Sequence, residues 1–281
     1  MEIVSTIVTI RERITAARLK GQKIAFVPTM GFLHQGHLSL LEEGRKRGDL
    51  LVLSIFVNPT QFGQGEDFED YPRDLKRDAE LAESVGVDLI FAPLAPEMYP
   101  KGYASFVDGE GITEVLCGAS RPGHFRGVTT VVSKLFNIVQ PDVALFGNKD
   151  FQQLAVVRRM AIDLNMPIEI VGMPIYREAD GLAMSSRNVY LSEDQRRQAL
   201  VLSQSISSAK GLAQVGDLDC QEIIATIKET ISSQPDAKID YVKICHQLTL
   251  EEQTKVDADS VLLLAVFFGK TRLIDNSFLL G

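Results

Sequence analysis

The amino-acid sequence predicts an α/β fold, with a Rossmann-like, doubly wound parallel sheet followed by a smaller C-terminal α+β domain. Short apolar runs alternate with longer helical patterns over the first 175 residues, which is typical of βαβ units whose strands are covered on both faces. After Pro174 a polar, glycine-containing segment leads into helices and then into further strand-like runs. We therefore expect two domains, residues 1–175 and 176–281.

Five apolar runs are expected to form the parallel sheet. Each is short and is followed by a turn or a polar segment, as in LLVLSIFVN, which lies between Asp49 and Pro59. The predicted strands are Lys23–Thr29, Leu50–Asn58, Val87–Ala92, Val143–Phe146 and Ile168–Val171.

Helices are expected between these strands. In Val128–Val139, apolar residues recur at positions 128, 131, 132, 135, 136 and 139, the spacing of one helix face. The other helices predicted in this part are His37–Arg47, Pro72–Val85 and Phe151–Leu164. For the second domain we expect helices near Ser192–Ala213 and Cys220–Ser232, and strands at Tyr241–Cys245 and Val261–Phe268.

Composition excludes several classes of protein. The formal net charge of −8 and the pI near 5.1 disfavour a nucleic-acid partner, because no local basic patch offsets the overall field. The three cysteines are widely spaced and form no C-x-x-C pair, which indicates a reducing compartment. The apolar stretch near the N-terminus is too short for a secretory signal or a membrane span. We expect a cytoplasmic protein with no membrane partner.

The first candidate site is Met30–His37 (MGFLHQGH), at the turn between the first of these strands and the following helix. A helix N-terminus offers free backbone N–H groups and a partial positive charge, so phosphates bind there readily. His34 and His37 fall on one helical face, and Gly36 between them lets a nucleotide approach the backbone closely. Both imidazoles are expected to donate to phosphate oxygens.

Two simpler interpretations remain for the histidine pair. The rings would also suit a capping pair at the helix start or a metal pair on the surface, and short motifs of this kind often arise by chance. The chain has only four histidines, and two of them lie at this strand-to-helix turn. That position favours the nucleotide site.

The second candidate site is Phe146–Gln153 (FGNKDFQQ), where another predicted strand ends and a helix begins. In open α/β sheets, ligands bind at this edge. Lys149 suits a phosphate group and Asp150 suits ribose hydroxyls. Alternatively, Asp150 only caps its helix and Lys149 is a solvated loop lysine.

The third candidate site is Ala183–Asn188 (AMSSRN), in the segment between the two predicted domains. Two hydroxyls beside the guanidinium of Arg187 suit a triphosphate, because arginine offers a planar fork of charge-assisted donors. A turn followed by a helix cap is the alternative interpretation.

Two glutamines are candidates for recognising a small acid. Gln61 and Gln153 each follow a predicted strand, and a neutral amide can bond both hydroxyl and carboxylate groups. The alternative is a surface glutamine in each case.

Two further segments carry clustered charges. Gly118–Gly127 (GASRPGHFRG) is interpreted either as a mobile lid over anionic phosphates or as a basic surface loop. The acidic stretch Glu66–Asp78 is interpreted as a solvated loop and helix start rather than a metal cage.

Six segments together resemble the pantothenate synthetase family in their order and spacing, from about residue 20 to residue 195. They are PTMGFLHQGH, FVNPTQF, YPRDL, RPGHFRGV, LFGNKDFQQL and DGLAMSSRNVYLS. The resemblance implies membership of the nucleotidyltransferase superfamily, with an H-x-G-H signature and a loop similar to K-M-S-K-S. In that loop Ala183 stands where the first lysine is expected, and Arg187 replaces the second.

The resemblance also implies roles for individual residues. Gln61 and Gln153 would bind pantoate, and Gln61 would also bind β-alanine. The catalytic residues would be His34, His37, Lys149 and Arg187, with His37 the candidate for donating a proton to pyrophosphate. The residues implied to bind ATP are Met30, Gly31, Phe32, Leu33, His34, Gln35, Gly36, His37, Gly147, Asn148, Lys149, Asp150, Tyr176, Met184, Ser185, Ser186 and Arg187.

The implied activity is condensation of (R)-pantoate with β-alanine, with ATP as co-substrate and Mg²⁺ as cofactor. Pantothenate, AMP and pyrophosphate would form through a pantoyl adenylate, as a step of pantothenate (vitamin B5) and coenzyme A biosynthesis. The resemblance also suggests a homodimer. Two alternatives stay open: a nucleotidyltransferase that leaves the nucleotide on its product, and a non-catalytic nucleotide-binding protein.

Overall fold

A computed structural model describes residues 1–215 and 219–280, which fall into two compact units. The first unit contains Met1–Gly147 and Val156–Pro174. The second contains Asn148–Ala155 and Ile175–Gly281. In this division the short segment Asn148–Ala155 groups with the C-terminal part of the chain.

The first unit is built on a parallel sheet with the strand order β1-β4-β3-β2-β5-β6, as the fold class predicts. Its elements are β1 (Glu2–Val4), α1 (Ile7–Leu19), β2 (Ile24–Thr29), α2 (Gln35–Arg47), β3 (Leu50–Ile55), η1 (Pro59–Gln61), α3 (Leu75–Ser84), β4 (Leu89–Phe91), α4 (Ala95–Met98), α5 (Cys117–Ser120), α6 (His124–Val139), β5 (Val143–Gly147), β6 (Glu169–Met173) and the later part of α7 (Phe151–Asp163).

The strand order reverses direction at the pair β2 and β5. From β2 the chain continues outward through β3 and β4 on one side, whereas β5 and β6 lie on the other side. Ala25 pairs with Val143 and Phe26 with Ala144, so these two strands run side by side. In a doubly wound sheet, ligands bind beyond the carboxyl ends of the strands at such a switch point. The carboxyl ends here are Thr29 and Gly147.

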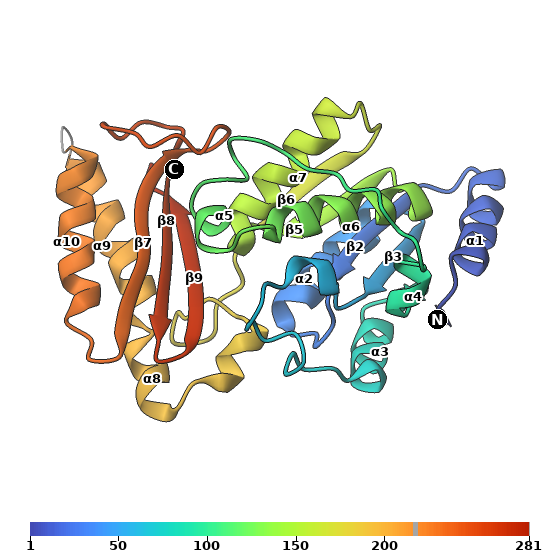
Figure 1. The fold of residues 1–281 in the computed structure, drawn as a ribbon, viewed down its shortest axis with the longest axis horizontal. Helices are drawn as coiled ribbons and strands as arrows, with labels where there is room; N and C mark the ends of the chain where they lie inside the picture. The colour runs from blue at the N-terminus through green and yellow to red at the C-terminus, as the bar shows by residue number, and fades with distance from the viewer. Residues whose placement is uncertain (216–218, 281) are drawn as a thin grey trace. The chain divides into compact units, whose positions relative to one another are not determined.

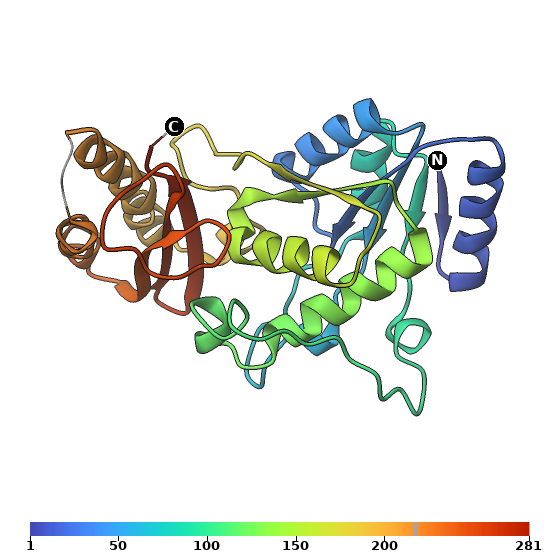
Figure 2. The same cartoon turned by 90° about the horizontal axis from the view of Figure 1, so that it is seen from above.

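Both faces of this sheet are covered by helices, with α2 on one face and α6 on the other (Figure 2). Leu41 of α2 is fully buried and packs in one cluster with Val27 and Leu53. On the opposite face, the ring of Phe26 lies 6.5 Å from that of Phe136 in α6. This double coverage explains why the strands are continuously apolar.

The second unit is a three-stranded antiparallel sheet, in the order β7-β8-β9, with α9 and α10 on one face (Figure 1). Its elements are η2 (Asn148–Asp150), the first part of α7, η3 (Ser186–Tyr190), α8 (Glu193–Gln198), α9 (Val201–Val215), α10 (Cys220–Ser232), β7 (Ala237–His246), β8 (Ser260–Phe268) and β9 (Thr271–Phe278). Ile223, Ile224, Ile227 and Ile231 of α10 are all buried against the sheet.

Several elements differ from the sequence prediction. Neither α1 nor the strands β1 and β9 were expected, and the predicted helix 192–213 is two helices, α8 and α9. The predicted strand Leu50–Asn58 ends at Ile55, because the Asn58 side chain accepts a hydrogen bond from Thr60 N–H and begins the short helix η1. Within the described residues, we find no helix with the length and apolar character needed to span a membrane.

Candidate active site

The first predicted motif forms the loop that joins β2 to α2 in the first unit. His34 is the N-cap residue of α2, and its backbone N–H donates to Nδ1 of His37 over 3.3 Å. The two imidazole rings are 4.0 Å apart between centroids. Because Nδ1 of His37 accepts this bond, the proton of the neutral ring lies on Nε2. The Nε2–H group of His37 is therefore the ring's hydrogen-bond donor.

A buried carboxylate from α3 fixes the backbone just before the histidines. Both oxygens of Asp78 accept hydrogen bonds, one from Phe32 N–H and one from Leu33 N–H, each of 2.7 Å. Gly31 has a φ of +86°, and a Cβ there would lie 2.9 Å from Ile55 Cγ2, so only glycine fits. Burial raises the pKa of Asp78, although these backbone hydrogen bonds oppose the rise. The expectation that Glu66–Asp78 is a solvated segment is wrong for Asp78, which is 1% exposed.

The amide of Asn58 determines which way the Gln61 side chain is turned. Asn58 Oδ1 accepts from Thr60 N–H at 3.3 Å and from the Tyr99 hydroxyl at 2.7 Å. Asn58 Nδ2 donates to the Gly127 carbonyl and to Gln61 Oε1, both at 3.1 Å. Backbone donors and acceptors cannot exchange roles, so the orientation of Asn58 is fixed. It follows that Gln61 is held by its oxygen and presents its NH₂ group.

Gln61 also contacts the histidine loop. Its Nε2 lies 3.1 Å from Sδ of Met30, the first residue of the predicted ATP segment. Gln61 itself is only 8% exposed, which contradicts the alternative of a surface glutamine. The first unit thus brings a predicted pantoate residue against a predicted ATP residue.

The segment Gly118–Gly127 is bonded to the turn that carries Gln61. Nε and Nη2 of Arg121 donate to the two carboxylate oxygens of Glu66 at 2.7 and 2.6 Å. Nδ1 of His124 lies 2.8 Å from the Gln61 carbonyl oxygen. A Cβ on Gly127 would lie 2.3 Å from the Thr60 carbonyl oxygen, so glycine permits the close approach of α6 to η1. These contacts support the backbone of Gln61.

In the second unit, the second motif forms the 3₁₀ turn η2 and the start of α7. Lys149 is 21% exposed at its side chain, and its Nζ lies 3.9 Å from Oδ2 of Asp150. Gln153 is half-buried in the first turn of α7. Asn276 of β9 donates to the carbonyl oxygens of Asn148 and Lys149, at 2.8 and 2.9 Å. Lys149 therefore extends from a turn whose backbone is fixed from β9.

A short antiparallel pairing places two further predicted residues opposite each other. Arg177 pairs with Ala183 in an antiparallel bridge, and Met184 N–H donates to the Tyr176 carbonyl at 3.0 Å. Tyr176 is 43% exposed, which suits stacking on a base. Tyr176 and Met184, both predicted to bind ATP, are thus neighbours in the fold.

The serines and arginine of the third motif lie at the start of η3. Ser185 is its N-cap, and the Ser185 hydroxyl accepts a hydrogen bond of 3.2 Å from Arg187 N–H. Asn188 Nδ2 donates to Glu178 Oε1 at 2.6 Å and to the Ala183 carbonyl at 3.2 Å. The side chain of Asn188 thereby joins this turn to the preceding antiparallel segment.

Four residues that hold these segments were not expected from the sequence: Asn58, Asp78, Asn276 and Asp275, whose carboxylate is paired with Arg177. Asn58 stands within FVNPTQF, where an asparagine before proline signals a turn. Asp78 was hidden among other acidic residues, and Asp275 and Asn276 lie in a stretch that was not expected to be a strand. Only Asn58 had a local signal.

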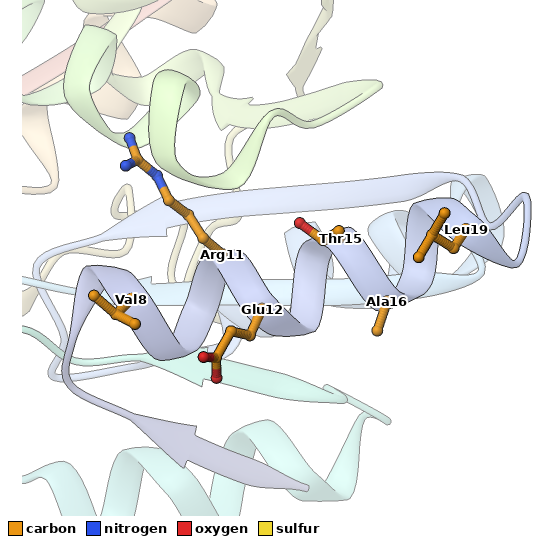
Figure 3. A pocket seen from close by; sticks show the side chains of 6 residues that line it. All are labelled: Val8, Arg11, Glu12, Thr15, Ala16 and Leu19. Atoms are coloured by element: carbon orange, nitrogen blue, oxygen red, sulfur yellow. The ribbon is translucent and has the colours of Figure 1, made fainter.

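We also searched the described residues for metal sites and for hollows away from the predicted site residues. No group of three or more histidine, cysteine, aspartate or glutamate side chains in residues 1–215 and 219–280 could hold a metal ion. A hollow along the outer face of α1 is lined by residues of that helix. Figure 3 shows the side chains of Arg11 and Glu12 pointing to opposite sides of the helix. The lining residues are Val8, Arg11, Glu12, Thr15, Ala16 and Leu19.

Comparison with known proteins shows the family of the chain. The family model described as pantoate-beta-alanine ligase matches residues 2–278. The chain belongs to the pantoate-β-alanine ligase family. It is therefore a ligase, and the resemblance predicted from the six motifs is confirmed.

Relatives and solved structures of the pantoate-β-alanine ligase family match over the full length. A pantothenate synthetase of Syntrophotalea carbinolica is 61% identical over 280 residues, covering 100% of this chain and 99% of the relative. One of Geotalea uraniireducens is 56% identical, covering 99% of each. The crystal structure of pantothenate synthetase from Thermus thermophilus has a TM-score of 0.95 at 47% identity and covers all of both chains. A pantoate-beta-alanine ligase from Francisella tularensis, complexed with beta-gamma ATP and beta-alanine, has a TM-score of 0.81 at 33% identity, covering 99% and 98%.

Proposed function

We propose that this protein joins pantoate to β-alanine with ATP, releasing pantothenate, AMP and pyrophosphate. The observation that carries the proposal is the match of the ligase family over residues 2–278. The histidine loop at the end of β2, beside the switch point of the sheet, supports the use of a nucleotide. The Francisella relative, solved with beta-gamma ATP and beta-alanine, is consistent with two of the three substrates.

The reaction has two steps. A pantoate carboxylate oxygen attacks the α-phosphorus of ATP, the bond from that phosphorus to pyrophosphate breaks, and pantoyl adenylate forms. The β-alanine amine then attacks the acyl carbon, AMP leaves, and the amine loses a proton. Such chemistry needs alignment and charge stabilisation rather than a covalent enzyme intermediate.

Residues of the first unit are suited to the phosphates and to pantoate. The helix N-terminus at Met30–His37 attracts negative charge, and His37 donates its Nε2 proton to a phosphate oxygen as pyrophosphate leaves. Gln61, held by its oxygen, donates from Nε2 to pantoate and later to the carboxylate of β-alanine. His34 completes the phosphate contacts. Gly147, at the end of β5, leaves room for the nucleotide because a Cβ built there would meet no atom within 4 Å beyond its chain neighbours.

Residues of the second unit are suited to the nucleotide. We assign charge stabilisation on the phosphates to Lys149 and Arg187, ribose contacts to Asp150 and a base contact to Tyr176. Gln153 is assigned to pantoate. The contacts of Asn148 and of Met184, Ser185 and Ser186 with ATP are assigned on the motif pattern.

Mg²⁺ is expected to enter with ATP. Magnesium usually takes one or two protein carboxylates and completes its octahedron with phosphates and water. Among the described residues, no group of three or more histidine, cysteine, aspartate or glutamate side chains could hold the ion, so the phosphates of ATP and water would supply most of its ligands. When bound, the ion neutralises charge on the phosphates.

One incubation tests the proposed function. The protein is supplied with ATP, pantoate, β-alanine and Mg²⁺, and the products are identified by mass. Pantothenate, AMP and pyrophosphate are expected together, whereas a product that retains the nucleotide contradicts the proposal. Without β-alanine, pantoate should still support exchange of labelled pyrophosphate into ATP, because adenylation is reversible.

We also propose that the protein works as a homodimer in the cytoplasm. Closed twofold dimers are the most common soluble oligomers, and the three buried cysteines form no disulfide, as expected in a reducing compartment. Light scattering at micromolar concentration should give twice the mass of the chain.

A further inference from the structure

Two adjacent residues of β9 contact different segments of the second unit. Successive side chains of a strand point to opposite faces, so Asp275 shares a face with Leu273 and Asn276 shares one with Phe278. Leu273 belongs to the core beneath α9 and α10, whereas the Phe278 ring lies 5.8 Å from that of Phe151 at the start of α7. Asp275 and Asn276 are 1% and 5% exposed. Both polar side chains are therefore buried inside the second unit.

Asn276 holds the turn that carries Lys149. Its Nδ2 has two hydrogens, and it donates to two consecutive carbonyl oxygens, those of Asn148 and Lys149. Fixing both carbonyls fixes the peptide planes on either side of the Lys149 Cα, and hence the direction of its side chain. Aspartate cannot donate here, and serine can satisfy only one of the two oxygens.

Asp275 holds the segment that leads to the third motif. Its carboxylate, fully buried, receives a bidentate pair from Arg177 at 2.7 and 2.9 Å. Arg177 also donates to the Gly181 carbonyl and pairs through its backbone with Ala183, the residue before Met184. A buried carboxylate with a bidentate guanidinium has a single favoured geometry, so it defines where this segment runs.

The two contacts are linked within β9 itself. Asp275 Oδ1 also accepts a hydrogen bond of 2.8 Å from Asn276 N–H. The backbone at Asn276 is therefore tied to the ion pair that holds the third motif, while its side chain holds the second. One dipeptide anchors both segments.

We propose that Asp275 and Asn276 are positioning residues for the nucleotide, Asn276 acting through Lys149 and Asp275 through the segment that ends in Arg187. The proposal rests on the proposed function, in which Lys149 and Arg187 stabilise charge on the phosphates. It extends the active site to a strand in which the sequence showed no motif. Neither residue is required to touch ATP.

A double-mutant cycle in the full chain tests the role of Asn276. The variants are Asn276→Ala, Lys149→Ala and the double variant, and the measured quantity is kcat/KM for ATP in pantoate-dependent pyrophosphate exchange. Asn276→Ala should lower this value about tenfold or more, because a misplaced charge-stabilising group loses much of its effect. In the Lys149→Ala background the same change should lower it less than about twofold, since the side chain being positioned is gone.

Controls separate positioning from loss of folding. Asp240→Asn breaks the ion pair between Asp240 of β7 and Arg272 of β9, in the same sheet, and should leave kcat/KM for ATP unchanged. Asn276→Ser keeps one donor and should give an intermediate loss; it replaces Asn276→Ala in the cycle if the alanine variant does not fold. Equal losses in both backgrounds, or no loss with Asn276→Ala, would overturn the proposal.

A parallel cycle tests Asp275 through its partner. Arg177→Lys keeps the positive charge that the buried carboxylate needs but cannot form the bidentate pair. Arg177→Lys should lower kcat/KM for ATP severalfold in the wild-type background. In the Arg187→Ala background the same change should leave kcat/KM for ATP unaltered. If Arg177→Lys lowers kcat/KM by the same factor in both backgrounds, Asp275 is not a positioning residue. Failure of the wild-type protein to exchange pyrophosphate would instead contradict the proposed function, so that measurement is made first.

Discussion

The histidine loop of the first unit and the Lys149 turn of the second unit are held by hydrogen bonds of opposite direction. In the first unit a carboxylate, Asp78, accepts hydrogen bonds from the backbone N–H groups of Phe32 and Leu33. In the second unit side-chain donors, Asn276 and Arg177, bond to backbone carbonyls of their segments. The histidine loop is thus held through its N–H groups, whereas the Lys149 turn and the segment after Arg177 are held through C=O groups.

The arrangement in the first unit is the more sensitive of the two to substitution. Asp78 is buried with its two backbone donors and the more distant Arg77, 3.7 Å away, and burial raises its pKa. The buried carboxylate of the second unit, Asp275, has a bidentate arginine. A buried carboxylate without a bidentate cationic partner depends more strongly on each hydrogen bond that it receives. We therefore expect the largest positioning effect at Asp78.

The largest loss of activity should come from replacing His37, whose Nε2 carries the proton of the neutral ring. His37→Ala should lower the rate of adenylation by about 100-fold or more, the usual contribution of a proton donor. Pyrophosphate exchange measures this rate. His246→Ala, a change to a histidine at the end of β7, serves as the control and should leave the rate unchanged. A folded His37→Ala variant with near-normal exchange would exclude the catalytic assignment.

Asp78→Asn tests whether a single carboxylate holds the histidine loop. The new NH₂ group would face a backbone N–H, so one of the two bonds is lost and the loop shifts. A displacement of this kind should lower adenylation by about 10- to 100-fold. Asp74→Asn is the matched control on the same helix, because asparagine caps a helix as well as aspartate does. An equal loss in both variants would contradict the positioning role.

Gln61→Glu and Gln153→Glu compare the two units directly, since one glutamine lies in each. Glutamate keeps the shape of the side chain but removes both donors and faces an anionic substrate. Losing a hydrogen bond to a charged partner costs about 1.5–3 kcal/mol, so KM for pantoate should rise about tenfold or more. KM for ATP, measured on the same samples, should change little. Unchanged pantoate values in both variants would reject the pantoate site.

The smallest effect concerns the ion pair that supports the Gln61 turn. Burial raises the pKa of Glu66, but hydrogen bonds and charge from Arg121 outweigh it and leave the pKa below its ordinary value. Such a carboxylate stabilises the fold above its unfolded-state pKa and loses this contribution as pH falls through the lower folded-state value. Glu66→Gln should therefore lower the thermal midpoint by about 2–4 °C at neutral pH for a loss of about 1 kcal/mol.

Thermal melts at pH 7 and at acid pH check the sign of this effect. The difference between wild type and Glu66→Gln should shrink as the solution is acidified below the ordinary range of glutamate. Glu69→Gln, a change at an exposed position nearby, should show no difference at either pH. If the difference in thermal midpoint between wild type and Glu66→Gln stays constant with pH, the carboxylate charge does not stabilise the turn.

Sequence reasoning found the segments of the candidate site but not what holds them. Met30–His37 and Asn148–Asp150 were recognisable because each follows an apolar strand and begins a helix, a local pattern with a physical cause. The same logic predicted the parallel sheet. Asp78 was missed because its partners are more than 40 residues away, and burial of one acid among several leaves no periodic signal.

The strand β9 was missed for a related reason. Its sequence, TRLIDNSF, contains an aspartate and an asparagine in the middle, residues that favour turns and are depleted in strands. Here both side chains find internal partners, so tertiary contacts override the local preference. Those partners, Asn148 and Arg177, are 128 and 98 residues away in the chain.

The segment Asn148–Ala155 limits how the protein can be divided. A polypeptide ending at residue 174 would contain this segment but not β9, so Phe151 would lose the ring of Phe278, and the turn at Lys149 would lose both donors from Asn276. A polypeptide beginning at residue 175 would have the complementary defect, with β9 presenting Asn276 and Phe278 to solvent on that face. Neither fragment is a complete folding unit, and genetic fusions or split versions of this protein should be joined elsewhere in the chain.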